Sequence, residues 1–286
     1  MKIVILGSKG FLGTKAKEIL SKNHEIIEGG RSNETEFQVD ATKKEEVRKF
    51  LLKHKPEVVL DTIALTSSVQ CENNPELAEQ LNYLTAKNIS EVCREIGAWM
   101  IFISSSYLFD GEKGNYNEED ETMPINEYAR TKIMAEEEVL KNPKSVILRV
   151  DIMYGYNGKD KKNGVFGMIL SGNPINLRQP NQLRQPIFID DVLRIMIELI
   201  KKNQQGIFHL AGPNRIKMID FLKSLESIFR EKSLVSVETK PQENILKMPK
   251  IPSNATFDTS KIQKLGAFFT DFDSGLKIME KDLGKF

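Results

Sequence analysis

Cysteine, histidine and tryptophan are scarce in this sequence, and long hydrophobic runs are lacking. The 286 residues contain two cysteines, Cys71 and Cys93, which are too few for a disulfide framework in a chain of this length. The hydrophobic runs stay below the roughly 18 residues that a membrane-spanning helix needs. The first apolar segment starts without a signal peptide pattern. We therefore expect reduced thiols, a cytoplasmic location and no membrane partner.

An excess of charge of one sign is also lacking. Lys and Arg number 41 against 40 Asp and Glu, a formal net charge of +1, so the chain offers no overall positive field for nucleic acid. His24, His54 and His209 have no metal-binding spacing with one another or with the cysteines, and we expect no metal. A G-x-S-x-G nucleophile elbow is absent, which excludes that serine-hydrolase arrangement.

What the sequence does contain is a regular alternation of strand and helix patterns. Short apolar runs, typical of strands buried on both faces, occupy 2–7, 24–30, 57–65, 99–106, 145–155 and 206–212. Helical apolar spacing occupies 11–21, 43–55, 75–96, 126–141 and 190–202. This alternation predicts an α/β fold of the Rossmann type, with a doubly wound parallel sheet that helices cover on both faces.

The alternation weakens after Gly155. Residues 156–186 are rich in Gly, Asn, Pro and Lys, and we expect loops there with one short helix at 165–170. The last part of the chain mixes helices and loops. We predict a dinucleotide-binding domain and a smaller, partly interleaved C-terminal substrate-binding lobe, formed by 1–151 with 188–212 and by 152–187 with 213–286, respectively.

A glycine-rich turn, GSKGFLG at 7–13, joins the first strand to the first helix. Gly7 allows a sharp turn, Gly10 removes a side chain that would block a pyrophosphate, and Gly13 lets the helix pack close to the strand. The N–H groups at the helix start would face the phosphates. An ordinary glycine-rich turn without a ligand is the alternative. The cofactor-binding residues predicted here are Gly7, Ser8, Lys9, Gly10, Phe11 and Leu12.

The choice of cofactor depends on the end of the second strand, which has the sequence Glu28-Gly29-Gly30-Arg31. A site for NAD usually places a carboxylate there for the ribose hydroxyls, whereas NADP needs a cation. The Arg31 guanidinium could bind a 2′-phosphate in a two-pronged fashion. Glu28 could supply a carboxylate, although it lies early in the strand. We therefore predict NADPH, with NADH as the alternative cofactor and a solvated loop arginine as the alternative for Arg31.

A tyrosine and a lysine lie four residues apart in a helical stretch, at Tyr128 and Lys132. This spacing puts both side chains on one face of the helix. An ammonium beside a phenol would lower the phenol's pKa from about 10, which suits proton transfer near neutral pH. Residues 104–106, three serines, end the fourth strand at the sheet edge where ligands bind. A surface pair on a helix is the alternative.

Several segments extend this pattern along nearly the whole chain. They are GSKGFLG at 7–13, CENNPELAEQLN at 71–82, ISSSYLFDGEKGNYNEEDETMPIN at 103–126, YARTK at 128–132, LRVDIMYG at 148–155, NQLRQPIFIDD at 181–191, GIFHLAG at 206–212 and FDTSK at 257–261. Together they resemble the extended short-chain dehydrogenase/reductases, and among these the dTDP-4-dehydrorhamnose reductases. The resemblance implies NADPH-dependent reduction of a 4-keto-6-deoxy sugar attached to a nucleotide.

The resemblance also implies roles for individual residues. Tyr128 would protonate the carbonyl oxygen as hydride arrives, Lys132 would hold the nicotinamide ribose, and Ser105 would bond the substrate oxygen. The further cofactor contacts that it implies are Asp40, Ala41, Ile63, Ala64, Asn82 and Ser104. The further substrate contacts are Thr66, Ser106 and Tyr107. Arg184 is a candidate for the nucleotide's phosphates, because a fixed guanidinium suits them.

Alternatives remain for several of these assignments. Capping or turn chemistry would explain Thr66, Asp40 and Asn82 equally well, and Arg184 could be a solvated loop charge. Lys15 stands where some relatives have a metal-binding glutamate, which favours the absence of a metal. The rival functions are a nucleotide-sugar epimerase or dehydratase with tightly held NAD, and a non-catalytic NADP-binding subunit resembling the methionine adenosyltransferase beta subunit. A homodimer stays open.

Overall fold

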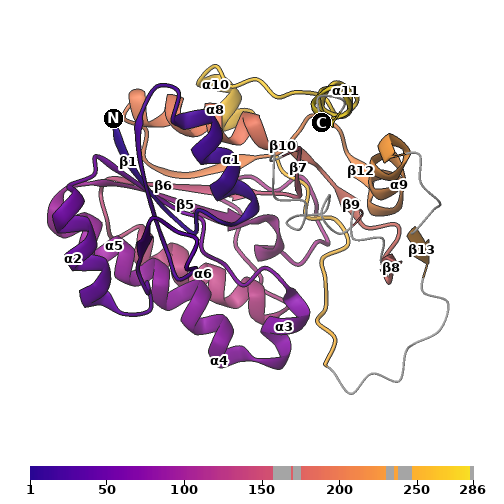
Figure 1. Ribbon diagram of the computed structural model, residues 1–286. Helices are drawn as coiled ribbons and strands as arrows, with labels where there is room; N and C mark the ends of the chain where they lie inside the picture. The colour runs from indigo at the N-terminus through magenta and orange to yellow at the C-terminus, as the bar shows by residue number, and fades with distance from the viewer. Residues whose placement is uncertain (157–168, 170–174, 230–234, 238–246, 284–286) are drawn as a thin grey trace.

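Seven parallel strands form the central sheet (Figure 1). In spatial order they are β3 (Phe37–Gln38), β2 (Glu25–Gly30), β1 (Lys2–Leu6), β4 (Val58–Asp61), β5 (Trp99–Ser105), β6 (Ser145–Val150) and β11 (Gly206–Leu210). Strand order reverses between β1 and β4, and in such sheets ligands bind at the carboxyl ends beside that reversal. The predicted Rossmann-type class is confirmed.

The computed structural model describes residues 1–156, 169, 175–229, 235–237 and 247–283. Successive side chains of a strand point to opposite faces of the sheet. Ile3 and Ile5 of β1 therefore enter one apolar core, while Val4 and Leu6 enter another. All four side chains are fully buried, as expected for a parallel strand with helices on both faces.

Helices cover the two faces of the sheet (Figure 1). The first face carries α1 (Phe11–Leu20), α8 (Ile189–Lys201) and the short α10 (Ser260–Lys264), whose apolar residues join one core. The second face carries α2 (Lys44–His54), α5 (Thr85–Ile96) and α6 (Glu127–Val139), which join the other core. The expected helices at 11–21, 43–55, 126–141 and 190–202 are thus present within one or two residues at each end.

The helix expected at 75–96 contains a turn of different geometry. It runs as α4 (Pro75–Ala78), a π-helical turn η1 (Glu79–Leu84) and α5, and it follows a short helix α3 (Ser68–Asn73) that the sequence pattern did not indicate. A π turn inserts an extra residue into a helix and re-aims the side chains around it. Here it holds Asn82, which is fully buried.

The strand expected at 145–155 is divided in two. β6 ends at Val150, and after two residues β7 (Met153–Tyr154) pairs with β10 (Ile187–Phe188) outside the main sheet. The division falls at Asp151, whose carboxylate accepts hydrogen bonds from the side chain of Ser106 and the backbone N–H of Gln185. These contacts draw the chain away from the sheet.

The segment expected as loops also contains short strands, β8 (Ile175–Leu177) and β9 (Leu183–Arg184). The helix expected at 165–170 falls outside the described residues, apart from Ile169. A third apolar core lies beside the sheet and involves β12 (Ile216–Lys217), α9 (Met218–Phe229) and α11 (Phe272–Leu283), while β13 (Val235–Val237) pairs with β8. The division of the chain into two domains stays a prediction.

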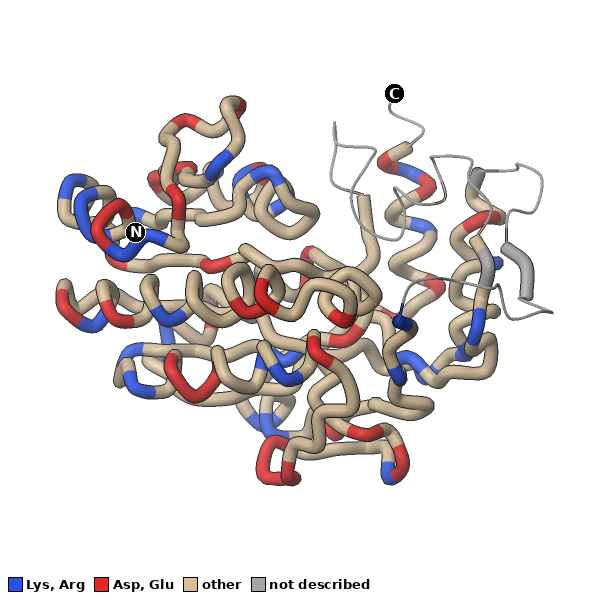
Figure 2. The backbone as a smooth tube through the Cα atoms, turned by 90° about the horizontal axis from the view of Figure 1, so that it is seen from below, with Lys and Arg blue, Asp and Glu red and all other residues tan. Residues whose placement is uncertain are grey.

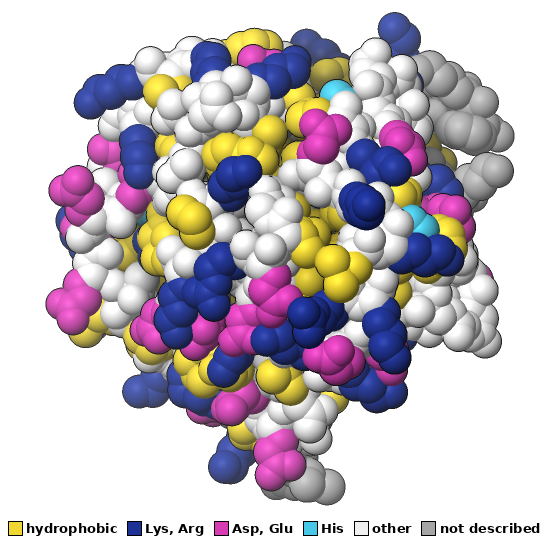
Figure 3. Space-filling model, turned by 90° about the vertical axis from the view of Figure 1, so that its left-hand side faces the viewer, with side chains coloured by type: hydrophobic (Ala, Val, Ile, Leu, Met, Phe, Trp, Pro, Cys, Tyr) yellow, Lys and Arg dark blue, Asp and Glu magenta, His cyan; other side chains and the backbone are white. Residues whose placement is uncertain are grey.

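Charged residues of both signs are interspersed over the molecule. Figure 2 shows basic and acidic positions alternating along the helices, and Figure 3 shows small apolar areas between charged side chains on one face. Cys71 and Cys93 are free and buried, as expected for reduced thiols. Within the described ranges, the helices are too short or too polar to cross a membrane.

Candidate functional site

The glycine-rich turn has the shape of a cradle. Gly7 has a φ of +86°, and a Cβ there would lie 2.6 Å from Thr62 Oγ1, which donates to the carbonyls of Leu6 and Gly7. A Cβ on Gly13 would lie 2.4 Å from the Gly7 carbonyl oxygen. A Cβ on Gly10 would meet only that same oxygen, at 3.3 Å, and would otherwise fill open space. Two glycines thus allow close packing, while Gly10 leaves room for a ligand.

The first turn of α1 begins at this open space. Gly10 is the N-cap residue, no side chain accepts a hydrogen bond from the turn, and no acidic residue lies in it. The N–H groups of such a turn, with the positive end of the helix dipole, attract phosphate. Ser8 is buried beneath the turn, and Phe11 and Leu12 begin the helix. These residues fit the pyrophosphate of a dinucleotide.

Glu28 on β2 is already engaged by cations. It is buried, forms an ion pair with Lys17, and lies 3.6 Å from Lys9 Nζ. Burial alone would raise the pKa of Glu28, but the hydrogen bond and charge of Lys17 and the charge of Lys9 lower it. Because lysines already bind its carboxylate, Glu28 is less available to the ribose hydroxyls of NADH, the alternative role considered for it. Arg31, at the end of the strand, is exposed.

Asp40 takes part in a turn before α2. Its Oδ1 accepts hydrogen bonds from the N–H of Thr42 at 3.1 Å and from the Thr42 hydroxyl at 2.7 Å. Burial would raise the pKa of Asp40, but these bonds and the charge of nearby Arg31 lower it. Ala41 is buried, and its carbonyl accepts a bond from Asn88 at 2.9 Å. Turn chemistry thus explains Asp40, and its contact with the cofactor stays a prediction.

The loop after β4 follows the cradle. Asp61 Oδ1 accepts a hydrogen bond from the N–H of Ile63 at 3.0 Å. Ile63 is half-buried, whereas Ala64 and Thr66 are exposed. The exposed positions are accessible to a ligand at the carboxyl end of the sheet, and their predicted contacts remain untested.

Asn82 fixes this loop to α6. Its side-chain amide accepts from the N–H of Leu65 at 2.7 Å, and it donates to the Leu65 carbonyl at 3.3 Å and to the Thr131 hydroxyl at 3.1 Å. A weaker contact reaches Cys71 Sγ at 3.9 Å. Asn82 is fully buried and its amide bonds within the protein, and its predicted contact with the cofactor stays a prediction. Asn82 supports the loop.

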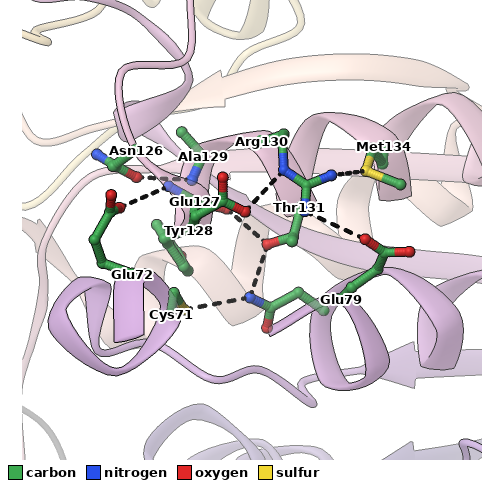
Figure 4. A network of polar contacts seen from close by, with 11 residues as sticks. Cys71, Glu72, Glu79, Asn126, Glu127, Tyr128, Ala129, Arg130, Thr131 and Met134 are labelled. Atoms are coloured by element: carbon green, nitrogen blue, oxygen red, sulfur yellow. Dashed lines mark hydrogen bonds and ion pairs between the residues drawn. The ribbon is translucent and has the colours of Figure 1, made fainter. Parts of the chain in front are cut away.

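The start of α6 is firmly held (Figure 4). Asn126 Oδ1 caps the helix by accepting from the N–H of Ala129 at 2.9 Å, and Glu72 accepts from the N–H of Glu127 at 3.2 Å. Arg130 binds Glu127 at 2.8 Å and Glu79 at 3.2 Å. Tyr128 lies within this first turn, so its backbone is fixed by groups from α3 and the π turn.

Ser105 and Tyr128 come together as expected. Ser105 is the last residue of β5, and its Oγ accepts from the N–H of Tyr107 at 3.1 Å. Burial raises the pKa of Tyr128 to about 12, opposed by the neighbouring Ser105 hydroxyl and by the charge of Arg184. The expected lowering of this pKa is therefore wrong for this structure, and the phenol keeps its proton at neutral pH.

Lys132 lies on the same helix but deeper in the core. Its side chain is buried, and Nζ lies 3.8 Å from the centre of the Phe102 ring. Burial lowers the pKa of Lys132 to about 8, opposed by the charges of Asp61 and Glu136. Lys132 is not among the principal groups that act on the phenol, which explains why the pKa of Tyr128 is not lowered.

Arg184 belongs to a buried network rather than to a solvated loop. Its guanidinium forms an ion pair with Asp151 and donates to the Tyr107 hydroxyl at 2.9 Å. Ser106 also donates to Asp151, at 2.9 Å. The Tyr107 ring meets Tyr128 edge-on, with centroids 6.2 Å apart. Arg184 and Ser106 are therefore bound within the protein, and their substrate contacts stay predictions.

The sequence interpretation missed Asp151. It directly follows β6 at the carboxyl edge of the sheet, next to the end of β5, so its position was the signal that could have identified it. Ser104, predicted to contact the cofactor, has a buried Oγ without a hydrogen-bond partner among the described residues. Such an unsatisfied hydroxyl is consistent with a polar ligand at this edge.

Lys15 occupies the position considered for a metal. It is nearly buried, and Nζ lies 3.3 Å from Glu18 and 3.6 Å from Asp190. Among the described residues, no group of three or more His, Cys, Asp and Glu side chains is placed to hold a metal ion.

Known proteins resemble this chain along its length. The sequence model of the RmlD substrate binding domain matches residues 1–284. The methionine adenosyltransferase 2 subunit beta of Mus musculus is 30% identical and covers 96% of this chain and 86% of its own. The dTDP-4-dehydrorhamnose reductase of Aggregatibacter actinomycetemcomitans is 25% identical, and the match covers 96% of this chain and 97% of the reductase. A crystal structure of a dTDP-4-dehydrorhamnose reductase from Clostridium acetobutylicum has a TM-score of 0.85 at 27% identity, covering 100% of both chains.

Proposed function

Because the chain belongs to the RmlD substrate binding domain family, we propose that it is an NADPH-dependent reductase of a nucleotide-linked 4-keto-6-deoxy sugar. The observation that carries this proposal is the pairing of Ser105 with a protonated, half-buried Tyr128 at the carboxyl edge of the sheet. The open cradle at Gly10 begins at the same edge, after β1. A hydride donor and a proton donor would thus serve one carbonyl group.

The residues divide the reaction between them. NADPH supplies the hydride when it is bound. The Ser105 hydroxyl orients the carbonyl oxygen of the sugar, and Tyr128 Oη gives its proton to that oxygen as the carbon receives hydride, so that the ketone becomes an alcohol. Lys132 would hold the nicotinamide ribose when the cofactor is bound.

The cofactor residues follow from the cradle. The backbone of 7–12 would bind the pyrophosphate, and the cations Lys9 and Arg31 favour a 2′-phosphate over free hydroxyls. The engagement of Glu28 by two lysines supports the same choice. We propose NADPH as the preferred cofactor, with NADH accepted more weakly.

A direct assay tests the proposal. The purified protein is mixed with NADPH and dTDP-4-dehydrorhamnose, NADPH oxidation is followed by absorbance, and the product is identified by NMR. We expect NADPH consumption that depends on the sugar, and a slower rate with NADH. The absence of oxidation with this substrate and with other nucleotide-linked 4-keto sugars would contradict the proposal.

The phenol has its own test. Tyr128→Phe removes the proton donor while keeping the ring, so turnover should fall about a hundredfold or more while NADPH affinity barely changes. Tyr83→Phe is the matched control, because Tyr83 lies on the π turn and contacts Lys87 rather than Ser105. Near-normal turnover in Tyr128→Phe would remove the tyrosine from the mechanism.

A second candidate function is a non-catalytic subunit that binds NADP and serves a partner. It is favoured by the 30% identity to the methionine adenosyltransferase 2 subunit beta, which exceeds the 25% identity to the reductase. Mixing the protein with a methionine adenosyltransferase catalytic subunit and analysing the mixture by size-exclusion chromatography tests this candidate. A stable complex, without turnover on any keto sugar, would favour the subunit over the reductase.

A further inference from the structure

A carboxylate interrupts an apolar row in the core beneath α5 and α6. Asp61 ends β4, its exposed fraction is 1%, and it lies two residues after Val59 on the same face of the sheet. Its neighbours in the sheet register are Leu6 on β1 and Phe102 on β5. Leu6, Val59 and Phe102 all belong to one apolar core, so Asp61 stands where a hydrophobic residue is expected.

The Lys132 ammonium enters the same layer from α6. Lys132 is also 1% exposed, and its Nζ lies 3.8 Å from the centre of the Phe102 ring. Phe102 is the direct cross-strand neighbour of Asp61, and such neighbours point to the same face. The two opposite charges therefore share one apolar space.

The two carboxylate oxygens of Asp61 have different environments. Oδ1 accepts the N–H of Ile63 at 3.0 Å and so holds the loop after β4. Oδ2 is buried and lacks a hydrogen-bond partner among the described residues. A buried carboxylate oxygen without a partner is unfavourable unless an opposite charge lies nearby.

The other titratable groups of this layer do not supply that balance. Cys93 on α5 faces Asp61, and its thiol has a raised pKa because of burial and the nearby carboxylate. Glu136, one turn after Lys132, is held by Arg149 of β6 at 2.7 and 3.0 Å. Among the described residues that act on Lys132, Asp61 is thus the carboxylate without a cation of its own.

We propose that Asp61 is a positioning residue, which keeps the buried Lys132 protonated and at the same time fixes the loop at Ile63. Its effect on the lysine needs no ligand. The use of the resulting ammonium, to hold the cofactor ribose, rests on the proposed function.

The pKa of each group is shifted by burial and by the charge of the other group, as this geometry implies. Burial lowers the pKa of Lys132 to about 8, and the charge of Asp61 opposes that fall. Burial raises the pKa of Asp61 to about 6, opposed by the Ile63 N–H and by the charge of Lys132. Each group thus favours the charged form of the other, so removal of the Asp61 charge should shift Lys132 toward its neutral amine.

The lysine can be observed directly by NMR of the unliganded protein labelled with ¹³C at the lysine ε-carbons. Its signal is the one that disappears in Lys132→Arg. We expect Asp61→Asn to lower the pKa of this lysine by one unit or more, a proton affinity at least tenfold weaker. Asp191→Asn is the matched control, since Asp191 is also buried, on α8, and pairs with Arg194. It should leave the lysine unchanged.

A reciprocal measurement keeps the proposal testable if Asp61→Asn does not fold. In Lys132→Met, carboxyl ¹³C NMR should show the pKa of Asp61 rising, because its counter-charge is gone. The proposal is overturned if the lysine in Asp61→Asn shifts no more than in Asp191→Asn. It is equally overturned if Asp61 titrates at the same pH with and without Lys132.

A third measurement follows NADPH binding by fluorescence from neutral to alkaline pH. We expect affinity to fall at lower pH in Asp61→Asn than in the wild type, and an identical pH dependence would overturn the positioning role. The NMR titrations contain neither cofactor nor substrate. A protein that reduces no keto sugar would therefore contradict the proposed function while leaving the titrations intact.

Discussion

His209 is an imidazole that the fold keeps neutral. It is fully buried on β11, Nδ1 lies 3.0 Å from the Tyr116 carbonyl oxygen, and its ring stacks on Phe257 with centroids 4.0 Å apart. Arg149, bound to Glu136, lies 3.4 Å from Nε2. Burial, and next the Arg149 charge, lower the pKa of His209 to about 3. The ring therefore serves as packing, as the lack of metal spacing suggested.

This histidine makes folding sensitive to acid. Between pH 6.5 and about 3, His209 is protonated in the unfolded chain but neutral in the folded protein. The free energy of unfolding therefore falls as the pH falls through that window. From pH 6.5 to 5 the contribution is about 2 kcal/mol. His209→Gln should show a smaller loss than the wild type when urea unfolding is compared at the two pH values. Equal losses in both proteins would contradict the assignment.

The π turn shows what a helical pattern cannot reveal. Apolar spacing over 75–96 predicted a helix, and a helix is present, but the extra residue in η1 changes only the local backbone bonding and leaves the apolar pattern readable. Similarly, β-branched runs predicted the strands, yet the division after Val150 depends on side-chain bonds to Asp151 from elsewhere in the chain. Local sequence patterns therefore identified the helices and strands. The place where a strand is interrupted depends on contacts with residues far away in the sequence.

The main structural consequence of the π turn η1 is the position of Asn82. Asn82→Ala would leave the N–H and carbonyl of Leu65 without partners, and a loss of about 1–3 kcal/mol in unfolding free energy is expected. Asn88→Ala removes a single bond, to the Ala41 carbonyl, and should lose less. Denaturant midpoints of the two variants provide the comparison. A loss in Asn82→Ala no greater than in Asn88→Ala would be evidence against its role as a tie between loop and helix.

A long-range ion pair and a hydrogen bond join β9 to residues that follow strands of the main sheet. Arg184 on β9 binds Asp151 and Tyr107, which are 33 and 77 residues away in sequence. Spacing along the chain could not show that these groups meet, so Arg184 was interpreted as a phosphate ligand or a solvated charge. Ser105, Tyr128 and the glycine turn were predictable because their order along an α/β sheet places them at one edge.

Removal of this arginine should weaken the whole molecule. Arg184→Gln leaves the Asp151 carboxylate buried and uncompensated, and a loss of about 3–5 kcal/mol is expected. Arg194→Gln is the control, because Arg194 is partly exposed and its pair with Asp191 is screened by water. Urea unfolding of both variants measures the difference. If Arg184→Gln loses no more stability than Arg194→Gln, the link between the segments carries little of the fold.

Three adjacent strands finish on polar groups: Asp61 at the end of β4, Ser105 at the end of β5, and Asp151 just past β6. The apolar stretches before them carry the packing, while Asp61 and Asp151 hold the segments that follow and Ser105 stands beside Tyr128. An engineer could therefore vary Ser105 with little change to the hydrophobic scaffold, whereas Asp61 and Asp151 would have to stay. The same separation would let related chains diverge in chemistry long before their architecture changes.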